Sequence, residues 1–419
     1  MPDRISRPAA LRSAPAIAIV GAGVVGAAIA YALCRRGAHV TLIDRAEPGR
    51  GCSFGNAGAL SPGSVAPLAL PGLAKSLPRL LLDPDSPLHL PPAYLPRALP
   101  WLLRFVAASR PDRVEAIAER LAALNADAIE HHLDLAREVG AADLIRRTGH
   151  LHVYPDAGAL AKDAYAWTLR ARHGVRFERL DRAGIEALEP GLSPRYTVGI
   201  WLADHAVVVN PFRYVQQIVR GFVVRGGRLV RDQVRAIEPD LPRGWSVATA
   251  EGRQNVDHVI VAAGMHSAAL LEPLGIRLPL ESQRGYHVTF RGVAAPVSRV
   301  VVLADRKAFV TPMEQGFRIA GTVEFGGLTR PANPRRSALL ARFAREAFTD
   351  VAGAEESHWM GHRPCTPESL ALVGPVASRP GLWVATGHGH LGLTQSVNTA
   401  RLLADAILEG APVLTPAVA

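Results

Sequence analysis

The clearest pattern of apolar and polar positions lies near the N-terminus. Residues 16–20 form an apolar run with the length of a buried parallel strand. Small and apolar side chains then recur over residues 27–33, as on a buried helix, and Gly37 marks the end of that helix. A second apolar run, residues 39–43, follows at once. The pattern predicts a strand, a helix and a second strand in immediate succession.

The rest of the chain mixes helical and strand periodicities. Helical spacing predicts helices over residues 111–140, 157–173, 211–224, 335–348 and 396–408. Apolar runs predict strands at 226–237 and at 256–264, the second of which is buried and ends in small residues. Short strands separated by turns between residues 285 and 323 predict an antiparallel sheet.

Three glycines occupy the turn between the first strand and its helix. Gly21, Gly23 and Gly26 form G-x-G-x-x-G, which allows a tight turn, a close approach of backbone to a pyrophosphate, and close packing of helix on strand. The N-terminus of the helix favours an anion at the same place. Asp44 ends the second strand, where its carboxylate can accept hydrogen bonds from both ribose hydroxyls of an adenosine. This unit predicts a site for FAD or NAD.

The overall composition is that of a globular protein. The 419 residues, 48% hydrophobic and 20% charged, can form two domains or one large one, and no apolar run is long enough to span a bilayer. The net charge is +10, but the arginines are scattered, so we expect no nucleic-acid partner. Residues 1–15 lack the apolar core of a secretory signal, and Cys34, Cys52 and Cys365 form neither a metal motif nor a disulfide framework. We therefore expect a reducing, cytoplasmic location.

Two further glycine-rich segments distinguish between the two cofactors. Residues 49–63 form a loop rich in Gly, Ser and Asn, which can wrap a cofactor with backbone amides. Near the other end of the chain, Gly387, Gly389 and Gly392 precede a helix whose N-terminus can stabilise negative charge on a reduced flavin ring. One glycine-rich turn for the pyrophosphate and another for the ring favour FAD over NAD.

Residues 65–106 are rich in proline and leucine, with basic residues between them. The part from 95 to 109 predicts a short amphipathic helix that carries Arg97, Trp101, Leu102, Leu103, Arg104 and Phe105. Such a helix could contact an anionic membrane surface, with the protein peripheral at the inner face of the cytoplasmic membrane. More often such a segment packs on its own domain. The sequence leaves both interpretations open.

Four segments of the chain resemble the D-amino-acid oxidase superfamily of FAD enzymes, and in particular its bacterial D-amino-acid dehydrogenases of the small-subunit type. They are VGAGVVGAAIAYAL with VTLIDR at the start, NAGALSPG at 56–63, GHRPCTPESLALVGP at 361–375 and GHGHLGLTQSVNTARLLADAI at 387–407. The likeness is collinear over nearly the full length. The N-A-G-x-x-S-P-G and W-x-G-x-R-P-x-T-P pieces are its more specific parts.

The resemblance implies an α/β fold in two domains. A discontinuous FAD-binding Rossmann-like domain would be joined to a second, α+β substrate domain built on a mixed or antiparallel sheet. We expect the FAD-binding domain to comprise residues 16–64, 204–280 and 358–419. The substrate domain would then comprise residues 65–203 and 281–357.

The resemblance also implies the reaction, an FAD-dependent oxidative deamination of D-amino acids. The α-carbon would give a hydride to flavin N5, the imino acid would hydrolyse to a 2-oxo acid, and a quinone or another carrier would take the electrons. Two alternatives within enzymes remain: a dehydrogenase specific for a cyclic secondary amine such as D-hydroxyproline or D-proline, and a sarcosine- or glycine-type oxidase. A third is a flavin-binding partner subunit without turnover. Neither the oligomeric state nor the side-chain preference follows from the sequence.

The resemblance assigns site residues by position, with no residue certain as a catalytic group. Arg363 would bind the substrate carboxylate, and Tyr286, Phe309 and His390 would lie at the substrate pocket, although Phe309 lacks the hydroxyl that related oxidases have there. The expected FAD-binding residues are Gly21, Gly23, Val24, Val25, Gly26, Asp44, Arg45, Ser53, Asn56, Ala57, Gly58, Leu60, Val234, Ala263, Gly264, Gly361, Arg363, Gly387, His388, Gly389, His390, Leu391, Gly392 and Thr394. We expect no metal site, because no third ligand accompanies His388 and His390, and we expect the Cys52 thiol to be packed rather than bonded to flavin.

Overall fold

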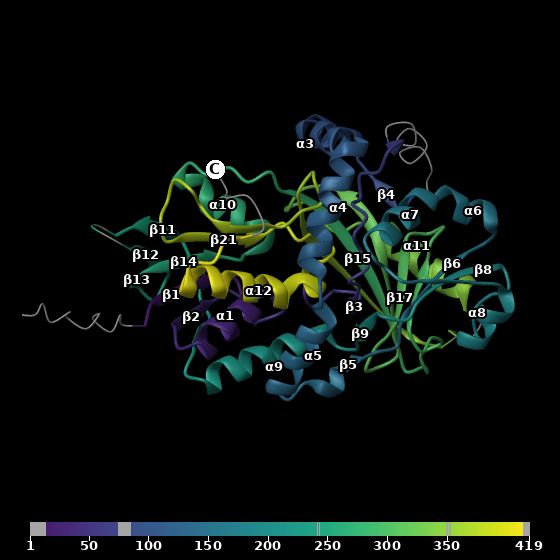
Figure 1. The fold of residues 1–419 in the computed structure, drawn as a ribbon, viewed down its shortest axis with the longest axis horizontal. Helices are drawn as coiled ribbons and strands as arrows, with labels where there is room; N and C mark the ends of the chain where they lie inside the picture. Colours follow the sequence, from purple (N-terminus) through teal and green to yellow (C-terminus); the bar gives the residue numbers. More distant parts are fainter. Residues whose placement is uncertain are drawn as a thin grey trace, which may run out of the picture.

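The computed structural model describes residues 14–73, 85–240, 242, 244–348, 351 and 353–413. These residues form two lobes, each built on its own sheet (Figure 1). Part of the proline- and leucine-rich segment, residues 74–84, lies outside the described part of the chain. The two-domain α/β prediction is confirmed by this arrangement and by the relatives described below.

The first lobe contains a six-stranded sheet that begins with the predicted strand–helix–strand unit. Its strands, in spatial order, are β10 (Arg228–Val230), β2 (His39–Ile43), β1 (Ala16–Val20), β14 (His258–Val261), β21 (Leu382–Thr386) and β20 (Leu372–Pro375). All neighbours are parallel except β20, which pairs antiparallel with β21. Helices α1 (Val24–Arg35), α9 (Pro211–Val224) and α12 (Gly392–Glu409) pack together on one face of this sheet (Figure 1).

The second lobe is built on a nine-stranded mixed sheet. Its strands, in spatial order, are β19 (Glu355–Cys365), β15 (Glu281–Arg291), β18 (Phe317–Phe325), β17 (Ala308–Pro312), β16 (Val300–Leu303), β6 (His150–Tyr154), β8 (Val198–Leu202) and β7 (Glu178–Leu180), and β4 (Leu88–His89) also pairs with β18. The pairs β15–β18, β17–β18 and β16–β17 are antiparallel, as the sequence predicts. The pair β16–β6 is parallel, so the sheet as a whole is mixed.

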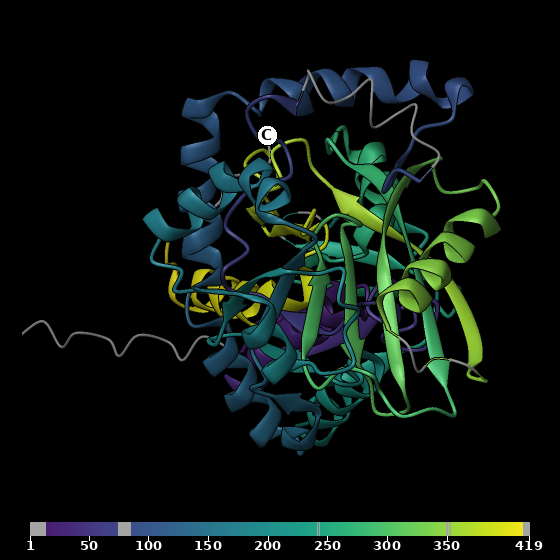
Figure 2. The ribbon, with the colours of Figure 1, turned by 90° about the vertical axis from the view of Figure 1, so that its right-hand side faces the viewer.

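The two faces of β15 and β19 have different surroundings. Because successive side chains on a strand point to opposite faces, Gln283 and His287 share one face with their partners Arg363 and Trp359. Tyr286, Val288 and Phe290 belong to the other face, which packs against α11 (Pro334–Ala347) in a hydrophobic core. Figure 2 shows α11 on the outer side of the sheet, away from the first lobe.

Smaller sheets and helices complete the fold. A three-stranded sheet joins β3 (Ala59–Leu60), β9 (Ala206–Val208) and β5 (Ile145–Arg146), and another joins β11 (Ala236–Pro239), β12 (Trp245–Ala248) and β13 (Arg253–Val256). The remaining helices are α3 (Leu95–Ala107), α4 (Pro111–Asn125), α5 (Ala128–Glu138), α6 (Ala157–Lys162), α7 (Ala164–Arg172), α8 (Arg182–Leu188) and α10 (Ser267–Leu271), with 3-10 turns at Pro92–Tyr94, Ala142–Leu144, Gly264–His266 and Glu272–Leu274.

Three predicted elements are divided in the structure. The helix predicted over 157–173 is divided at Asp163 into α6 and α7. The helix predicted over 111–140 is broken into α4 and α5, because Asp127 takes a left-handed conformation with a φ of 53°. The strand predicted over 226–237 is likewise two strands, β10 and β11, which belong to different sheets. Periodicity alone did not reveal these breaks, since the apolar spacing continues through them.

The expected domain boundaries can be compared with the sheet to which each strand belongs. β1, β2, β10, β14, β20 and β21 all belong to the six-stranded sheet, in keeping with three separated FAD-binding segments. β19, however, stays in the nine-stranded sheet up to Cys365. A boundary between residues 357 and 358 would divide this continuous strand, so we propose to place it after Cys365.

Candidate cofactor and substrate site

The turn between β1 and α1 is shaped by the absence of side chains. Gly21 has a φ of +109°, and a Cβ atom there would lie 2.5 Å from the carbonyl oxygen of Ala262. A Cβ atom on Gly26 would lie 1.9 Å from the carbonyl oxygen of Gly21. Since both obstacles are backbone atoms, neither position can accept a larger residue without moving α1 away from β1. The backbone of Gly23 remains open, with the Ser53 hydroxyl as the only neighbour, 3.5 Å from its ideal Cβ.

Polar groups of this turn point to where a pyrophosphate and a ribose would bind. The amide of Val24, in the first turn of α1, donates to the hydroxyl of Ser53 at 2.9 Å. Asp44 follows β2, and its carboxylate accepts hydrogen bonds from the amides of Ala22, at 2.7 Å, and Ala46, at 2.9 Å. Asp44 therefore holds the glycine turn and still has lone pairs for ribose hydroxyls. Val25 continues α1, and Arg45 lies beside His266.

Asp44→Ala is expected to weaken the retention of FAD. The variant loses an ionised acceptor, and hydrogen bonds to such groups contribute about 1.5–3 kcal/mol each. Titration of FAD-free protein with FAD measures the effect, and Asp44→Asn, which keeps one acceptor oxygen, should lie between the variant and the wild type. An unchanged FAD dissociation constant in Asp44→Ala would show that other groups hold the ribose.

The loop of residues 49–63 is tied to both lobes. The side chain of Asn56 accepts from the amide of Gly58 at 2.8 Å, and β3, which includes Leu60, pairs with β9. A Cβ atom on Gly58 would lie 2.3 Å from the carbonyl oxygen of Val208, so glycine is required there. The buried Arg318 of β18 donates to the carbonyl of Asn56 at 2.6 Å, which anchors Asn56 and Ala57 over the large sheet.

The residues that follow β14 lie beside the glycine turn in the first lobe. Ala263 and Gly264 follow the strand directly, and the Gly264 carbonyl accepts from the Thr386 hydroxyl at 2.9 Å. The carbonyl of the preceding Ala262 lies against Gly21, as described above. Val234 is 8% exposed and belongs to the core on the other side of this sheet.

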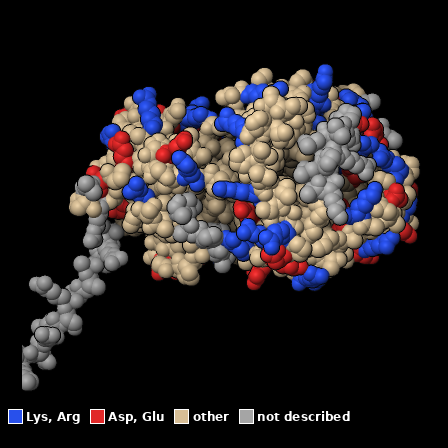
Figure 3. Space-filling view, turned by 90° about the horizontal axis from the view of Figure 1, so that it is seen from above, with Lys and Arg blue, Asp and Glu red and all other residues tan. Residues whose placement is uncertain are grey.

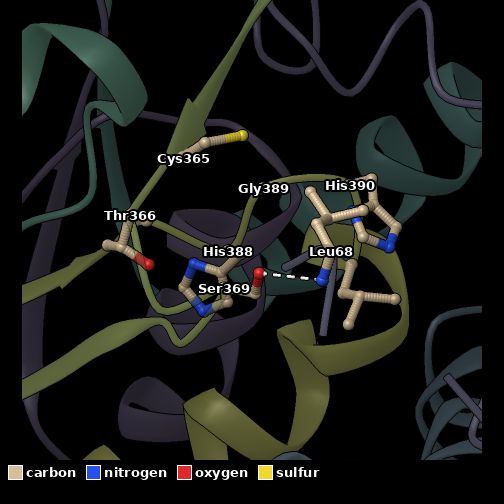
Figure 4. Close-up of a pocket in the computed structure, with 9 residues that line it drawn as sticks. Leu68, Cys365, Thr366, Ser369, His388, Gly389 and His390 are labelled. Carbon is tan, nitrogen blue, oxygen red and sulfur yellow. Dashed lines mark hydrogen bonds between the residues drawn. The ribbon is translucent and has the colours of Figure 1, made fainter. Parts of the chain in front are cut away.

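The turn before α12 brings the C-terminal glycines to the loop of residues 49–63. Gly387 and Gly389 have φ values of +79° and +55°, and α12 begins at Gly392. Thr394 accepts from the amide of Ser61 at 3.1 Å and so joins α12 to that loop. Among the described residues, Leu68, Cys365, Thr366, Ser369, Gly387, His388, Gly389, His390 and Leu391 line a cavity of about 10 Å³, which is roughly enough for one water (Figure 4).

The two histidines of this turn do not converge. His388 is 5% exposed and its Nε2 lies 3.0 Å from the hydroxyl of Thr399, so it fixes the turn on α12. His390 points the other way, beside Leu68, and its side chain is accessible to solvent (Figure 4). Burial lowers the pKa of His388 to about 4. The protein around the exposed His390, together with the charge of Arg363, lowers the pKa of that imidazole too, so both are neutral at pH 7. Among the described residues, no group of three His, Cys, Asp or Glu side chains could hold a metal ion.

Arg363 is a half-buried cation for which the described residues supply no counter-ion. It pairs with Gln283 across β19 and β15, and its Nη1 donates to the carbonyl of Thr322 at 3.0 Å. Among the described residues, no carboxylate forms an ion pair with it. Surrounding protein lowers its pKa, but arginine stays charged in proteins. Because an unpaired charge in such surroundings is costly, the position is suited to an anion supplied by a ligand.

Phe309 and Tyr286 have opposite placements. Phe309 of β17 pairs with Ala320, which shares the face of His287 and Arg363, and its ring is partly buried there. Tyr286 lies on the other face, 1% exposed, where its hydroxyl is bonded to Glu324 and to the amide of Asn333. We therefore withdraw Tyr286 from the substrate-binding residues. The sequence predicted the strand correctly but assigned the Tyr286 side chain to the wrong face of the sheet.

Cys52 lies near Arg363 and is exposed. Its thiol donates to the carbonyl of His362, and its side chain is accessible although protein surrounds it. Burial raises the pKa of Cys52 to about 11, against the opposing effect of Arg363. The group is thus a thiol at neutral pH. All three cysteines are free.

Several residues on the Arg363 face of the sheet were not predicted from the sequence. The Trp359 ring stacks on His287 with centroids 5.1 Å apart, and it fills the space that Cβ atoms on Gly55 and Gly361 would occupy. Gly361 is thus required by this ring. Thr322 is another residue that the sequence did not predict, and its backbone has a φ of 57°. The W-x-G-x-R-P spacing could have indicated Trp359, whereas no local signal marks Thr322.

These features fit FAD as the cofactor. The glycine turn leaves room for backbone to approach a pyrophosphate, Asp44 has the chemistry for a ribose, and α12 presents its N-terminus between the two lobes. Gly21, Gly23, Val24, Ser53 and Asp44 could hold the nucleotide part. The segments 56–60 and 387–394 could hold the ring.

Comparison with known proteins agrees with this fit. Residues 16–406 match the family model described as FAD dependent oxidoreductase (DAO). The chain is 36% identical over 396 residues to a D-amino-acid oxidase of Bradyrhizobium diazoefficiens, covering 93% of this chain and 94% of the relative. It is 35% identical over 428 residues to D-amino acid dehydrogenase 2 of Ralstonia nicotianae, covering 96% and 98%.

Solved structures share the fold at lower identity. Glycine oxidase from Geobacillus kaustophilus superposes with a TM-score of 0.75 at 21% identity, covering 97% of this chain and 100% of that one. L-proline dehydrogenase from P. horikoshii superposes with a TM-score of 0.74 at 15% identity, covering 96% of each chain. From the family match over most of its length and its relatives above 30% identity, this chain belongs to the DAO family of FAD-dependent oxidoreductases.

Proposed function

We propose that this FAD-dependent oxidoreductase oxidises D-amino acids, with Arg363 as the group that binds the substrate carboxylate. The observation that carries the proposal is the half-buried Arg363 guanidinium, which has one carbonyl partner and no described counter-ion. Its planar fork can bind a carboxylate through two parallel hydrogen bonds. The D configuration is supported by the names of the relatives, D-amino-acid oxidase and D-amino acid dehydrogenase.

The chain's own groups would orient the substrate and favour its reactive form. With the carboxylate held by Arg363, the α-carbon is confined to one place, and such positioning accounts for a large part of many catalysed rates. Neutral His390 and positive Arg363 offer no negative charge to stabilise a substrate ammonium group, so they favour the free amine. FAD, when bound, supplies the acceptor for two electrons. The amino acid thereby loses two electrons and two protons, and water converts the imino acid into a 2-oxo acid and ammonia.

Anaerobic mixing of the purified yellow protein with single amino acids tests this function. D-amino acids should bleach the flavin absorbance, and their L-enantiomers should not. Bleaching only by D-proline or D-hydroxyproline, or only by sarcosine or glycine, would assign the chain to one of the narrower alternatives. The absence of bleaching by every amine, with FAD bound in full, would contradict an enzymatic role and favour a flavin-binding partner subunit.

We further propose that a quinone or another carrier takes the electrons from the reduced protein. The proposal rests on the dehydrogenase name of one group of relatives. Reoxidation of the reduced protein by a soluble quinone analogue should be faster than by dissolved oxygen. A faster reaction with oxygen would instead indicate an oxidase.

We also propose that α3 docks on an anionic membrane surface. Residues 86–111 contain no acidic side chain, and Leu95, Leu99 and Leu103, spaced one helical turn apart, are 42%, 45% and 63% exposed. The view from above shows an area of uncharged residues in the middle of this face, with Lys and Arg side chains beside it (Figure 3). The opposite face of α3, with Trp101 at 7% exposure, packs against Phe325 and Cys365. Trp101 therefore belongs to the protein core, so this face of α3 follows the interpretation in which the helix packs on its own domain.

Leu95→Ser/Leu99→Ser/Leu103→Ser is expected to abolish binding to vesicles that contain anionic phosphatidylserine. Wild-type protein should sediment with them at low salt and be released at high salt, because surface electrostatics are screened. Val223→Ser/Val224→Ser/Leu229→Ser is a matched control, since these side chains are also exposed, at 45%, 79% and 37%. Equal sedimentation of the two triple variants would rule out α3 as the contact. Among the described residues, none of the helices has the length and apolar character needed to cross a bilayer.

A further inference from the structure

The pairing of β15 with β18 is interrupted beside Arg363. Arg284 pairs with Glu324 and Tyr286 with Gly321, so the single residue Gly285 faces two residues of β18, Thr322 and Val323. This is a β-bulge, which inserts an extra residue in one strand. Bulges are found next to active sites, where they redirect side chains or backbone groups.

The Arg363 guanidinium packs directly on the backbone of Gly285. An ideal Cβ atom on Gly285 would lie 2.3 Å from both Cζ and Nη2 of Arg363. Arg363 itself is on β19, opposite Gln283. Its side chain therefore runs from β19 across the backbone of β15 at Gly285 and reaches β18 on the far side. Only a residue without a side chain permits this path.

Thr322 holds the far end of the guanidinium. Its carbonyl accepts from Nη1 of Arg363 at 3.0 Å. The backbone of Thr322 has a φ of 57°, which is unfavourable for a β-branched residue, and its buried hydroxyl has no hydrogen-bond partner among the described residues. Neither feature serves the stability of the strand. Both follow from turning the carbonyl of Thr322 toward Arg363, and strain of this kind concentrates at functional sites.

We propose that Gly285 and Thr322 are positioning residues, which together fix the plane of the Arg363 guanidinium so that its free edge binds a carboxylate. The proposal rests on the function proposed above for Arg363. Because Gly285 has no side chain, it sets the distance between the Arg363 guanidinium and the backbone of β15. Thr322 occupies one donor through its carbonyl and so leaves the other donors for the ligand.

Gly285→Ala tests the role of Gly285. The added methyl group should displace the guanidinium, and a misplacement of about 1 Å can lower catalytic efficiency about 100-fold. We expect this loss in anaerobic flavin reduction by the best amino acid, with a weaker apparent affinity as well as a slower limiting rate. The FAD content should stay at the wild-type value. Gly199→Ala, in β8 of the same sheet, is the matched control, because its neighbours are side chains of Ile185, Leu151 and Leu180.

A double variant shows whether the effect passes through Arg363. Gly285→Ala/Arg363→Ala should be no slower than Arg363→Ala alone, since residues that act through one group are not additive. Additive losses would overturn the proposal. Where Gly285→Ala fails to fold, folding of the double variant supports the steric link, and its failure to fold overturns it.

Thr322→Gly tests which part of Thr322 acts. Glycine keeps the carbonyl and accepts the positive φ, so flavin reduction should remain within about threefold of the wild type. A loss as large as that of Gly285→Ala would overturn the assignment of the role to the backbone carbonyl.

Binding of benzoate, a carboxylate that cannot be oxidised at an α-carbon, separates this inference from the proposed function. Its titration is followed by the flavin absorbance of each FAD-loaded variant. If no amino acid reduces the wild type, the proposed function fails, yet weaker benzoate binding by both Arg363→Ala and Gly285→Ala still supports the positioning role. If Arg363→Ala binds benzoate more weakly and Gly285→Ala binds it as the wild type does, the positioning role is wrong.

Discussion

Arg363→Ala is expected to lower catalytic efficiency about 30-fold to several thousand-fold. The variant leaves the substrate carboxylate without its partner in a site surrounded by protein, and truncating one side of a buried hydrogen-bonded charge pair costs about 2–5 kcal/mol. Both the limiting rate and the apparent affinity should fall, because the same contact also fixes the α-carbon. Stopped-flow flavin reduction by the best D-amino acid measures both quantities. Arg363→Lys should recover part of the loss, since an ammonium cannot reproduce the planar two-point contact.

Two further measurements separate substrate binding from a structural role. Arg363 has no ion pair with the described residues, so its removal should not lower the melting temperature of the protein in the absence of substrate. The FAD content should also stay close to that of the wild type. A variant with full FAD that reduces as fast as the wild type would show that the carboxylate is bound elsewhere.

Gly26→Ala is expected to yield protein without bound FAD and with reduced stability. Its Cβ atom would lie 1.9 Å from the carbonyl oxygen of Gly21, and that oxygen belongs to the backbone of the turn itself. To relieve the clash, α1 must move away from β1, which moves the helix N-terminus from the position where it can bind a pyrophosphate. Overpacking of this kind typically costs about 1–3 kcal/mol, and sometimes more. Flavin absorbance per protein and thermal unfolding measure the two effects.

Gly51→Ala is the matched control for this experiment. It also lies in a glycine-rich segment, the loop of residues 49–63, but no atom of the described residues comes within 4 Å of its ideal Cβ. It should retain FAD and unfold at the wild-type temperature. If Gly26→Ala binds FAD as well as Gly51→Ala does, the turn is not the pyrophosphate site.

The nucleotide-binding unit could be predicted because its determinants are local. Gly21, Gly26 and Asp44 lie within one strand–helix–strand segment, where Gly26 lies against the Gly21 carbonyl and Asp44 accepts from the amide of Ala22. The obstacle that requires glycine at position 21 is the distant Ala262, so this contact also depends on the tertiary structure. The choice of FAD, confirmed at the level of the family, rested on glycine-rich segments far apart in the sequence. The individual FAD contacts and the substrate contact of Arg363 stay predictions, which the variants above test.

The sequence by itself determined the elements that depend on near neighbours: the glycine turn, the apolar strands, the amphipathic α3 and the antiparallel strands between residues 285 and 323. Only the tertiary structure decided which faces those elements present. Tyr286 was misassigned because a strand alternates its side chains with a period of two, so the face of each depends on register with β18 and β19. The sequence left the place of Trp101 open because the partner that buries it, Phe325, is distant in the chain. The bulge at Thr322 likewise arises from the pairing of separate strands, and no local pattern of residues encodes it.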